Sequence, residues 1–239
     1  MSPDPGPDPG PRHVVVREIE RADPAVVAAL GEQGTATVHE AIGTRGFAGP
    51  AIRPIQQGVR LAGSAITVSS HPGDNLMIHA AVEICAEGDI LVVTNTAPST
   101  HGMFGELLAT SLSTRGVRGL VIDAGVRDTL ELRQLGFPVW SRHVSCEGTV
   151  KASPGSVNVP VVLGGVVVGA GDVICADDDG VVVVPRDEAA WAVEQAAARI
   201  AKEDATRARL QAGELGLDLY GLRAKLAELG VRYVGDEDH

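Results

Sequence analysis

The sequence has few of the side chains on which several classes of binding protein depend. Phe, Trp and Tyr make up only 3% of its 239 residues. Base-stacking platforms and aromatic cages need clusters of such rings. Basic residues are outnumbered by acidic ones, 20 to 31, and the net charge is −11. A general nucleic-acid surface needs clustered Lys and Arg, so we expect no nucleic-acid partner.

Cysteine and long apolar runs are equally scarce. Cys85, Cys146 and Cys175 are scattered and form no C-x-x-C pattern, which indicates ordinary, partly buried thiols and neither a disulfide framework nor a zinc site. No apolar run approaches the roughly 20 residues that cross a bilayer. The first 11 residues are proline-rich and acidic, without a signal-peptide core. We therefore predict a cytoplasmic protein with no membrane partner.

Familiar catalytic signatures are absent too. The sequence contains no H-E-x-x-H, H-x-H, G-x-S-x-G or Walker A pattern. We interpret four scattered histidines as structural or solvent-bonded: His71, His79, His101 and His143. A bound metal would have few protein ligands and many waters, which suits Mg²⁺ or Mn²⁺ better than zinc.

What the sequence does contain favours a compact α/β protein. It is 44% hydrophobic, with 29 glycines, so it can bury a substantial core. Residues 1–12 cannot bury apolar surface and are expected to form a disordered arm. We predict an α/β domain over residues 13–185, which carries the site, and a C-terminal helical extension over residues 186–239.

Hydrophobic periodicity and turn residues predict the order of elements. We expect strand 59–69 to have a bulge at Gly63 and helix 73–85 to be capped by Asp74. The D-D-D-G run at 177–180 resembles part of a calcium loop, but an Asp-rich hairpin turn explains it more simply. The remaining expected elements are helices at 24–31, 35–43, 105–115 and 129–135, strands at 90–95, 117–123 and 137–142, valine-rich hairpins from 144 to 185, and helical pieces at 187–210 and 213–230.

The stretch from His101 to Asp128 is the centre of the prediction. It reads as a glycine-marked turn, a helix with Leu107, Leu108 and Leu112 facing the sheet, a buried strand, and a glycine turn that presents Arg127 and Asp128. Open α/β sheets bind ligands at the carboxyl ends of their strands. We therefore expect chemistry at these loops, with His101 as the nearest histidine.

Arg127 and Asp128 allow two interpretations. A guanidinium can hold a carboxylate through two parallel hydrogen bonds, and the adjacent carboxylate can hold a hard divalent cation. Alternatively, Asp128 and Glu131 form a helix-capping box with no further role.

Glu106 lies just inside the helix that begins near Gly105. It is a candidate catalytic acid, although a first-turn Glu can simply complement the helix dipole. The free amides of residues 105–108 offer a binding site for a small anion.

Gly105-Glu106 followed by Arg127-Asp128 forms a G-E-x20-R-D pattern that resembles the metal-dependent pyruvate aldolases of the RraA-like fold. The similarity, over about residues 20–234, is specifically to the 4-carboxy-4-hydroxy-2-oxoadipate and 4-hydroxy-4-methyl-2-oxoglutarate aldolases. Further matching segments are HPGDNLMIHAAVE, GDILVVTN, GFPVWSR, PGSVNVPVV, GDVICADDDGVVVVP and AGELGLDLY. The resemblance implies an αββα sandwich that assembles as a homotrimer or homohexamer, with sites between subunits and the helical extension packed on a neighbour.

The resemblance also implies roles for the site residues. Asp128 would carry Mg²⁺ or Mn²⁺, Arg127 would contact the substrate, and the amides of Gly105, Glu106, Leu107 and Leu108 would bind the pyruvyl carboxylate. The family motif often has Asp at the position of Glu106, so this chain has the longer acid.

A second acid aligns with the family's cross-subunit glutamate. By spacing it is Glu203, although the alignment could fall on Glu214. The simpler interpretation of Glu203 is an i,i+4 ion pair with Arg207 on a solvated helix face.

The expected activity is a class II retro-aldol cleavage of 4-hydroxy-2-oxo dicarboxylates or tricarboxylates. It would release pyruvate, and with the carboxylated substrate also oxaloacetate, in aromatic catabolism. A water held by Glu106 and Glu203 would act as the base, and oxaloacetate decarboxylation would be a side activity. The competing interpretation is a non-catalytic RraA-like regulator that binds a ribonuclease. A methyltransferase is disfavoured because no nucleotide-type glycine loop follows the first strand.

Overall fold

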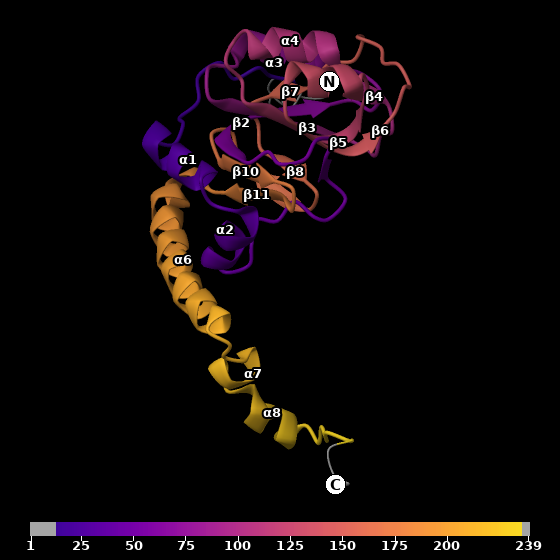
Figure 1. Cartoon of the computed structure of the whole chain (residues 1–239). Helices are drawn as coiled ribbons and strands as arrows, with labels where there is room; N and C mark the ends of the chain where they lie inside the picture. Colours follow the sequence, from indigo (N-terminus) through magenta and orange to yellow (C-terminus); the bar gives the residue numbers. More distant parts are fainter. Residues whose placement is uncertain (1–12, 236–239) are drawn as a thin grey trace, which may run out of the picture. The chain divides into compact units, whose positions relative to one another are not determined.

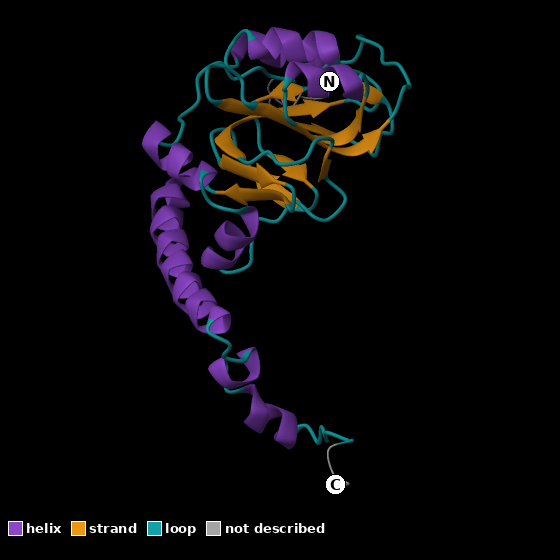
Figure 2. Cartoon of the chain, viewed as in Figure 1, coloured by secondary structure: helices purple, strands orange, loops and turns teal. Residues whose placement is uncertain are grey.

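The computed structural model describes residues 13–235 and shows a layered α/β fold. Figure 1 shows α3 (Leu76–Ile84) and α4 (Glu106–Ser113) over one side of the strands, and α1 (Pro24–Gly31) and α2 (Thr35–Ala41) on the other. The strands lie between these helical layers (Figure 2). The predicted αββα sandwich is thereby confirmed.

One large sheet supplies both β layers. Its order is β1-β6-β5-β3-β2-β10-β11, with β4 beside β5 and β7 beside β2. The strands β2, β3, β5 and β6 are parallel neighbours, whereas β1, β10 and β11 run antiparallel to theirs. Because β1 also contacts β11, the sheet nearly closes into a barrel. The strand bounds are β1 Arg53–Pro54, β2 Leu61–Ser70, β3 Asp89–Asn95, β4 Gly102–Phe104, β5 Gly119–Val126, β6 Val139–Val144, β7 Ser156–Val157, β8 Val161–Leu163, β9 Val166–Val168, β10 Val173–Asp177 and β11 Gly180–Val184.

Strand alternation sorts the core into layers. Leu91 and Val93 of β3 belong to the cluster beneath α3 and α4. Ile90 and Val92 point the other way, into the interior of the sheet with Trp140. A third cluster packs α1 and α2 against β10 and β11. Burial on both faces explains why the central strands read as continuous apolar runs.

Most predicted elements are present, with one clear error. The expected helix 129–135 is α5 (Thr129–Leu135), and the Asp-rich turn joins β10 to β11 as a hairpin. The predicted bulge at Gly63 is wrong, because β2 pairs with β10 through Gly63 without a register shift. Gly63 is needed instead for close approach, since a Cβ there would lie 2.6 Å from the carbonyl oxygen of Gly88.

The chain divides into two compact units, residues 1–196 and 197–239, of which residues 1–12 and 236–239 are outside the described part. The predicted arm at 1–12 therefore cannot be compared with the structure. The C-terminal helices are α6 (Ala189–Gln211), preceded by the 3-10 turn Arg186–Glu188, then α7 (Gly216–Leu219) and α8 (Leu222–Glu228). None of the helices within residues 13–235 is long and apolar enough to span a bilayer.

An ion pair between a buried carboxylate and a partly exposed arginine ties the N-terminal segment to the sheet. Asp89, at the start of β3, is fully buried and accepts hydrogen bonds from Arg21 at 2.7 and 2.9 Å. Its carboxylate also accepts a hydrogen bond from the amide of Ala86 at 2.8 Å. Removal of the guanidinium would leave a buried charge without its counterion, which is costly.

We predict that Arg21→Ala lowers the free energy of unfolding by about 3–5 kcal/mol, measured by urea denaturation. Arg17→Ala is the matched control, because its pair with Glu83 is exposed and should contribute at most about 1 kcal/mol. Equal losses in the two variants would contradict the assignment of Asp89 as a buried, paired charge.

Candidate functional site

Two short parallel strands bring the two halves of the predicted motif together. Gly102 of β4 lies opposite Gly125 of β5, and Phe104 lies opposite Val126. The amide of Arg127 donates to the carbonyl of Phe104 at 2.9 Å. Parallel strands that end at one edge place their following loops side by side, so Gly105 meets Arg127 and Asp128 across 22 positions of sequence.

Asp128 does not form the capping box. It precedes α5, but its φ of 55° is left-handed and its side chain makes no hydrogen bond to that helix. Its Oδ2 instead accepts the amide of Glu106, the first residue of α4, at 3.1 Å. The Nε of Arg127 lies 3.7 Å from the same oxygen. A positive φ is uncommon for a residue other than glycine, and such conformations cluster at functional sites.

Gly105 makes this approach possible. A Cβ built at Gly105 would lie 2.3 Å from Oδ2 of Asp128. The backbone of Gly105 is extended, with φ −155° and ψ −169°, so strain does not explain the glycine. Its role is to leave room for the carboxylate at the start of α4.

The pair lines two cavities. One of about 230 Å³ contains Arg127, Asp128, Gly105 and two leucines of α4, Leu107 and Leu108. The other, of about 300 Å³, lies between Arg127-Asp128 and the segment that follows β6, including Cys146. The side chains of Arg127 and Asp128 are 46% and 38% exposed. Both charged groups are therefore accessible to a small ligand.

Five further residues line the smaller cavity and were not predicted as site residues. Three of them have polar side chains: Asn75, His79 and Lys151. Asn75 immediately precedes α3 and lies four positions before His79, a spacing that could have indicated them. No sequence pattern indicated Lys151. Its loop reaches the start of α3 only through tertiary contacts, which the sequence does not reveal. Partial desolvation and the ammonium charge of Lys151 lower the pKa of His79, which favours the neutral imidazole.

The donor set at Asp128 fits a hard divalent ion. Oδ2 is bonded to the Glu106 amide, and Oδ1 makes no hydrogen bond within the described residues. In the part of the chain that the structure describes, no three His, Cys, Asp or Glu side chains gather in a way that could hold a metal. A single carboxylate supplemented by water suits Mg²⁺ or Mn²⁺ and does not suit zinc.

The side chain of Glu106 does not line either cavity, and the side chain of Leu107 does not face the sheet. The Glu106 carboxylate accepts a hydrogen bond from Oγ1 of Thr110 at 2.8 Å, along the helix surface, and lines neither cavity. Leu107 is 79% exposed, so the prediction that it faces the sheet is wrong. Leu108 and Leu112 are buried as predicted.

The predicted cross-subunit acids are both on the C-terminal unit. Glu203 pairs with Arg199 at 2.8 Å, so its i,i+4 partner is not the expected Arg207. Glu214 pairs with Arg209, which lowers the pKa of the Glu214 carboxyl.

Other predicted features have structural roles. The ring of His101 lies 3.3 Å from a carboxylate oxygen of Glu147 and outside both cavities. Cys85 and Cys175 are buried, and desolvation raises the pKa of each thiol to about 12, whereas Cys146 is exposed. All three thiols are free, consistent with the prediction of no disulfide.

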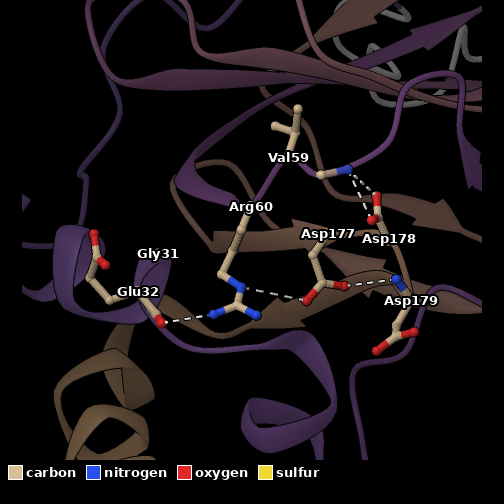
Figure 3. Close-up of a pocket in the computed structure, with 8 residues that line it drawn as sticks. Gly31, Glu32, Val59, Arg60, Asp177, Asp178 and Asp179 are labelled. Atoms are coloured by element: carbon tan, nitrogen blue, oxygen red, sulfur yellow. Dashed lines mark hydrogen bonds and ion pairs between the residues drawn. The ribbon is translucent and has the colours of Figure 1, made fainter.

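A cavity of about 460 Å³ beside the β10–β11 turn is larger than the two cavities at Arg127-Asp128, but two of the carboxylates that line it already bind other parts of the protein (Figure 3). Asp177 is buried and accepts hydrogen bonds from the amide and hydroxyl of Thr35, which fixes the start of α2. Asp178 accepts the amide of Gly58. These carboxylates hold loops together, as the hairpin interpretation implies.

We predict that Gly105→Ala, which displaces the Asp128 carboxylate, weakens Mn²⁺ binding by about 10- to 100-fold in calorimetric titration. Gly148→Ala is the control, because a Cβ at Gly148 meets no atom within 4 Å. Unchanged Mn²⁺ affinity in a folded Gly105→Ala variant would show that the approach of Asp128 to α4 does not build the site.

This fold and sequence are similar to those of known proteins. A family model described as "RraA-like: Aldolase/RraA" matches residues 35–183. A Halalkalibacterium halodurans protein, provisionally named a 4-hydroxy-4-methyl-2-oxoglutarate aldolase, is 28% identical over 169 residues, which cover 71% of this chain and 80% of that protein. A Burkholderia multivorans protein of the same name is 34% identical over 143 residues, covering 60% and 87%.

Among solved structures, one similar protein is Streptomyces coelicolor RraAS2, described as an unusual member of the RNase ES inhibitor RraA protein family. It is 30% identical with a TM-score of 0.72, and the match covers 80% of this chain and 99% of that one. The family-model match spans more than half of this chain, and the fold agrees with it. The chain therefore belongs to the RraA-like, or Aldolase/RraA, family.

Proposed function

We propose that this chain is a divalent-metal-dependent class II pyruvate aldolase. Its substrates would be 4-carboxy-4-hydroxy-2-oxoadipate, 4-hydroxy-4-methyl-2-oxoglutarate, or both. One observation carries the proposal: Asp128 leaves its own helix uncapped, binds the first amide of α4, and keeps one carboxylate oxygen free beside Arg127.

The residues of the smaller cavity suit the pyruvyl half of such a substrate. At the start of α4, the Glu106 amide is bonded to Asp128, and the next two amides, of Leu107 and Leu108, have no acceptor within the helix. These two amides would bind the pyruvyl carboxylate, helped by the positive end of the helix dipole. Asp128 would hold a Mg²⁺ or Mn²⁺ ion, which supplies Lewis-acid polarisation when bound.

Cleavage requires that negative charge be stabilised as it develops. Loss of the 4-hydroxyl proton converts C4–OH into a carbonyl, the C3–C4 bond breaks, and its electron pair is delocalised from C3 onto the 2-keto oxygen. The Arg127 guanidinium would neutralise that oxygen. A water held by Glu106, turned from Thr110, and by Glu203 of an adjacent subunit would take the hydroxyl proton and return one to C3. Loss of CO₂ from oxaloacetate would produce the same enolate, so we expect decarboxylation as a side activity.

This mechanism assigns the subunit interface a part in catalysis. Glu203 is on the C-terminal unit, and we propose that the unit packs on a neighbouring copy in a homotrimer or homohexamer. The exposed apolar side chains in and beside its helices support packing against another surface, since monomeric proteins rarely expose many of them together. They include Leu210, Leu215, Tyr220 and Leu229.

A ribonuclease regulator is the second candidate, because the similar RraAS2 belongs to an inhibitor family. Pyruvate release from either aldol in the presence of Mg²⁺ separates the two functions. Inhibition of a ribonuclease without pyruvate release would favour the regulator.

We predict that EDTA abolishes pyruvate release, that Mg²⁺ or Mn²⁺ restores it, and that Asp128→Ala is inactive at any metal concentration. The variant should remain folded, because the Asp128 side chain makes no cap to α5 and loses only one exposed hydrogen bond, from the Glu106 amide, worth about 1 kcal/mol. Coupled lactate dehydrogenase assays and circular dichroism measure the two properties. Full activity in EDTA would remove the metal from the mechanism.

Arg127→Ala should reduce both aldol cleavage and oxaloacetate decarboxylation by at least about 100-fold, because both reactions develop charge on the same oxygen. Arg115→Ala is the control, since Arg115 is an exposed arginine just beyond α4. Wild-type decarboxylation by Arg127→Ala would exclude Arg127 from enolate stabilisation.

A further inference from the structure

A further cavity, of about 330 Å³, lies at the edge of the sheet opposite to Arg127 and Asp128. Asp89 begins β3 and Arg118 directly precedes β5, so the two residues mark the amino ends of parallel strands. Arg127 and Asp128 follow the carboxyl end of β5. The full length of β5 therefore separates this cavity, which we call the amino-edge cavity, from the proposed catalytic site.

Arg118 contributes a guanidinium group that is only partly used by the protein. One of its nitrogens donates to the carbonyl oxygen of Ala62 at 2.7 Å. Its remaining N–H groups have no acceptor, and no carboxylate pairs with this side chain, within residues 13–235. Arginine presents five N–H donors in a fixed planar arrangement that matches a carboxylate. The bond to Ala62 holds the group in place and leaves donors for a ligand.

Ser64 adds a hydroxyl group to the wall of the same cavity. The residue is only 5% exposed, yet its hydroxyl has no hydrogen-bond partner in the part of the chain that the structure describes. Buried polar groups in folded proteins nearly always have such a partner. We therefore expect the Ser64 hydroxyl to form a hydrogen bond with whatever occupies the cavity.

The carboxylates of the amino-edge cavity differ in how far their charge is already neutralised. Asp89 is paired with Arg21 through two hydrogen bonds. Asp23 caps α1 with its side chain. Glu87 is exposed at the cavity and has neither an ion-pair nor a hydrogen-bond partner among the described residues. The cavity therefore presents one unpaired cation, Arg118, and one unpaired anion, Glu87, which form no ion pair with each other.

The rest of the wall is apolar. Ala22 and Val27 are 9% and 7% exposed, and together with Pro24 they bring the start of α1 to the cavity. A compact apolar group that displaced water from these side chains would bind favourably. The cavity volume is at the lower end of the roughly 300–1,000 Å³ of small-molecule pockets. The amino-edge cavity is thus suited to a small ligand with an apolar body and two opposite charges.

We propose that the amino-edge cavity binds a free α-amino acid with an apolar side chain. The carboxylate of the ligand would accept hydrogen bonds from Arg118 and Ser64, and its ammonium group would pair with Glu87. The apolar side chain would lie against Val27 and Pro24. A simple anion would leave Glu87 unneutralised, and a simple cation would leave Arg118 unneutralised. This site is separate from the proposed aldolase site and does not depend on that function.

Calorimetric titration of the full-length wild-type protein tests the ligand class, with L-valine, L-leucine and L-phenylalanine as probes. We expect at least one of them to bind saturably at millimolar concentrations, with one site per chain. The amide of that amino acid lacks the carboxylate and should bind at least about 10-fold more weakly, because charge-assisted hydrogen bonds to Arg118 are lost. The corresponding acid without the amino group should bind about 3- to 5-fold more weakly, since Glu87 is exposed.

Variants test the same assignments from the side of the protein. Arg118→Met should weaken binding of the amino acid by about 10- to 100-fold, and Glu87→Gln by about 3- to 5-fold. Arg17→Met is the control, because Arg17 is an exposed arginine outside the cavity and its affinity for the amino acid should equal that of the wild type. Circular dichroism verifies that each variant is folded.

The absence of saturable binding by all three amino acids would overturn the proposal. Equal affinity for the amino acid and its two analogues, or unchanged affinity in a folded Arg118→Met variant, would overturn it as well. If Arg118→Met does not fold, the comparison of the amino acid with its amide in the wild type decides the role of the guanidinium.

Discussion

The contact between Asp128 and the start of α4 is the constraint on which the site depends. It exists because β4 and β5 end at the same edge of the sheet and because Gly105 has no Cβ at the point of closest approach. The carboxylate accepts a hydrogen bond from a backbone amide and lies at the positive end of a helix dipole, and both attract its negative charge. It also adopts a backbone conformation that its own helix does not require. The geometry therefore places a charged oxygen, a guanidinium and free amides around one small cavity.

Strongly periodic parts of this fold could be predicted from sequence, and so could the identity of the central pair. Valine-rich runs bounded by glycine gave the strands, and the position of Arg127-Asp128 after a buried strand indicated a site. The conformation of Asp128 could not be predicted, because D-x-x-E is an ordinary capping pattern and only a tertiary contact overrides it. Leu107 was misplaced because an apolar residue at the start of a helix can face either the core or a cavity rim. Lys151 was missed because Asp74, which fixes its loop, lies more than 70 positions away.

The cavity reconciles the acidic composition of the chain with an anionic substrate. Distributed negative charge keeps the protein away from polyanions, whereas locally paired cations can still concentrate a small carboxylate. Arg127 and the α4 amides would bind the half of the molecule that becomes the enolate. Membership of the RraA-like family is compatible with aldol cleavage and with a regulatory role. The residues of the site therefore have to distinguish an enzyme from a regulator.

The central claim is that this site stabilises the enolate of pyruvate, and proton exchange at the pyruvate methyl group tests it most directly. Pyruvate would be incubated with the wild-type protein and Mg²⁺ in D₂O, and its methyl resonance followed by proton NMR. The account predicts that the protein accelerates loss of the signal, that EDTA stops the exchange, and that Arg127→Ala does not support it. A methyl signal that decays no faster with the wild-type protein and Mg²⁺ than in buffer would contradict the account.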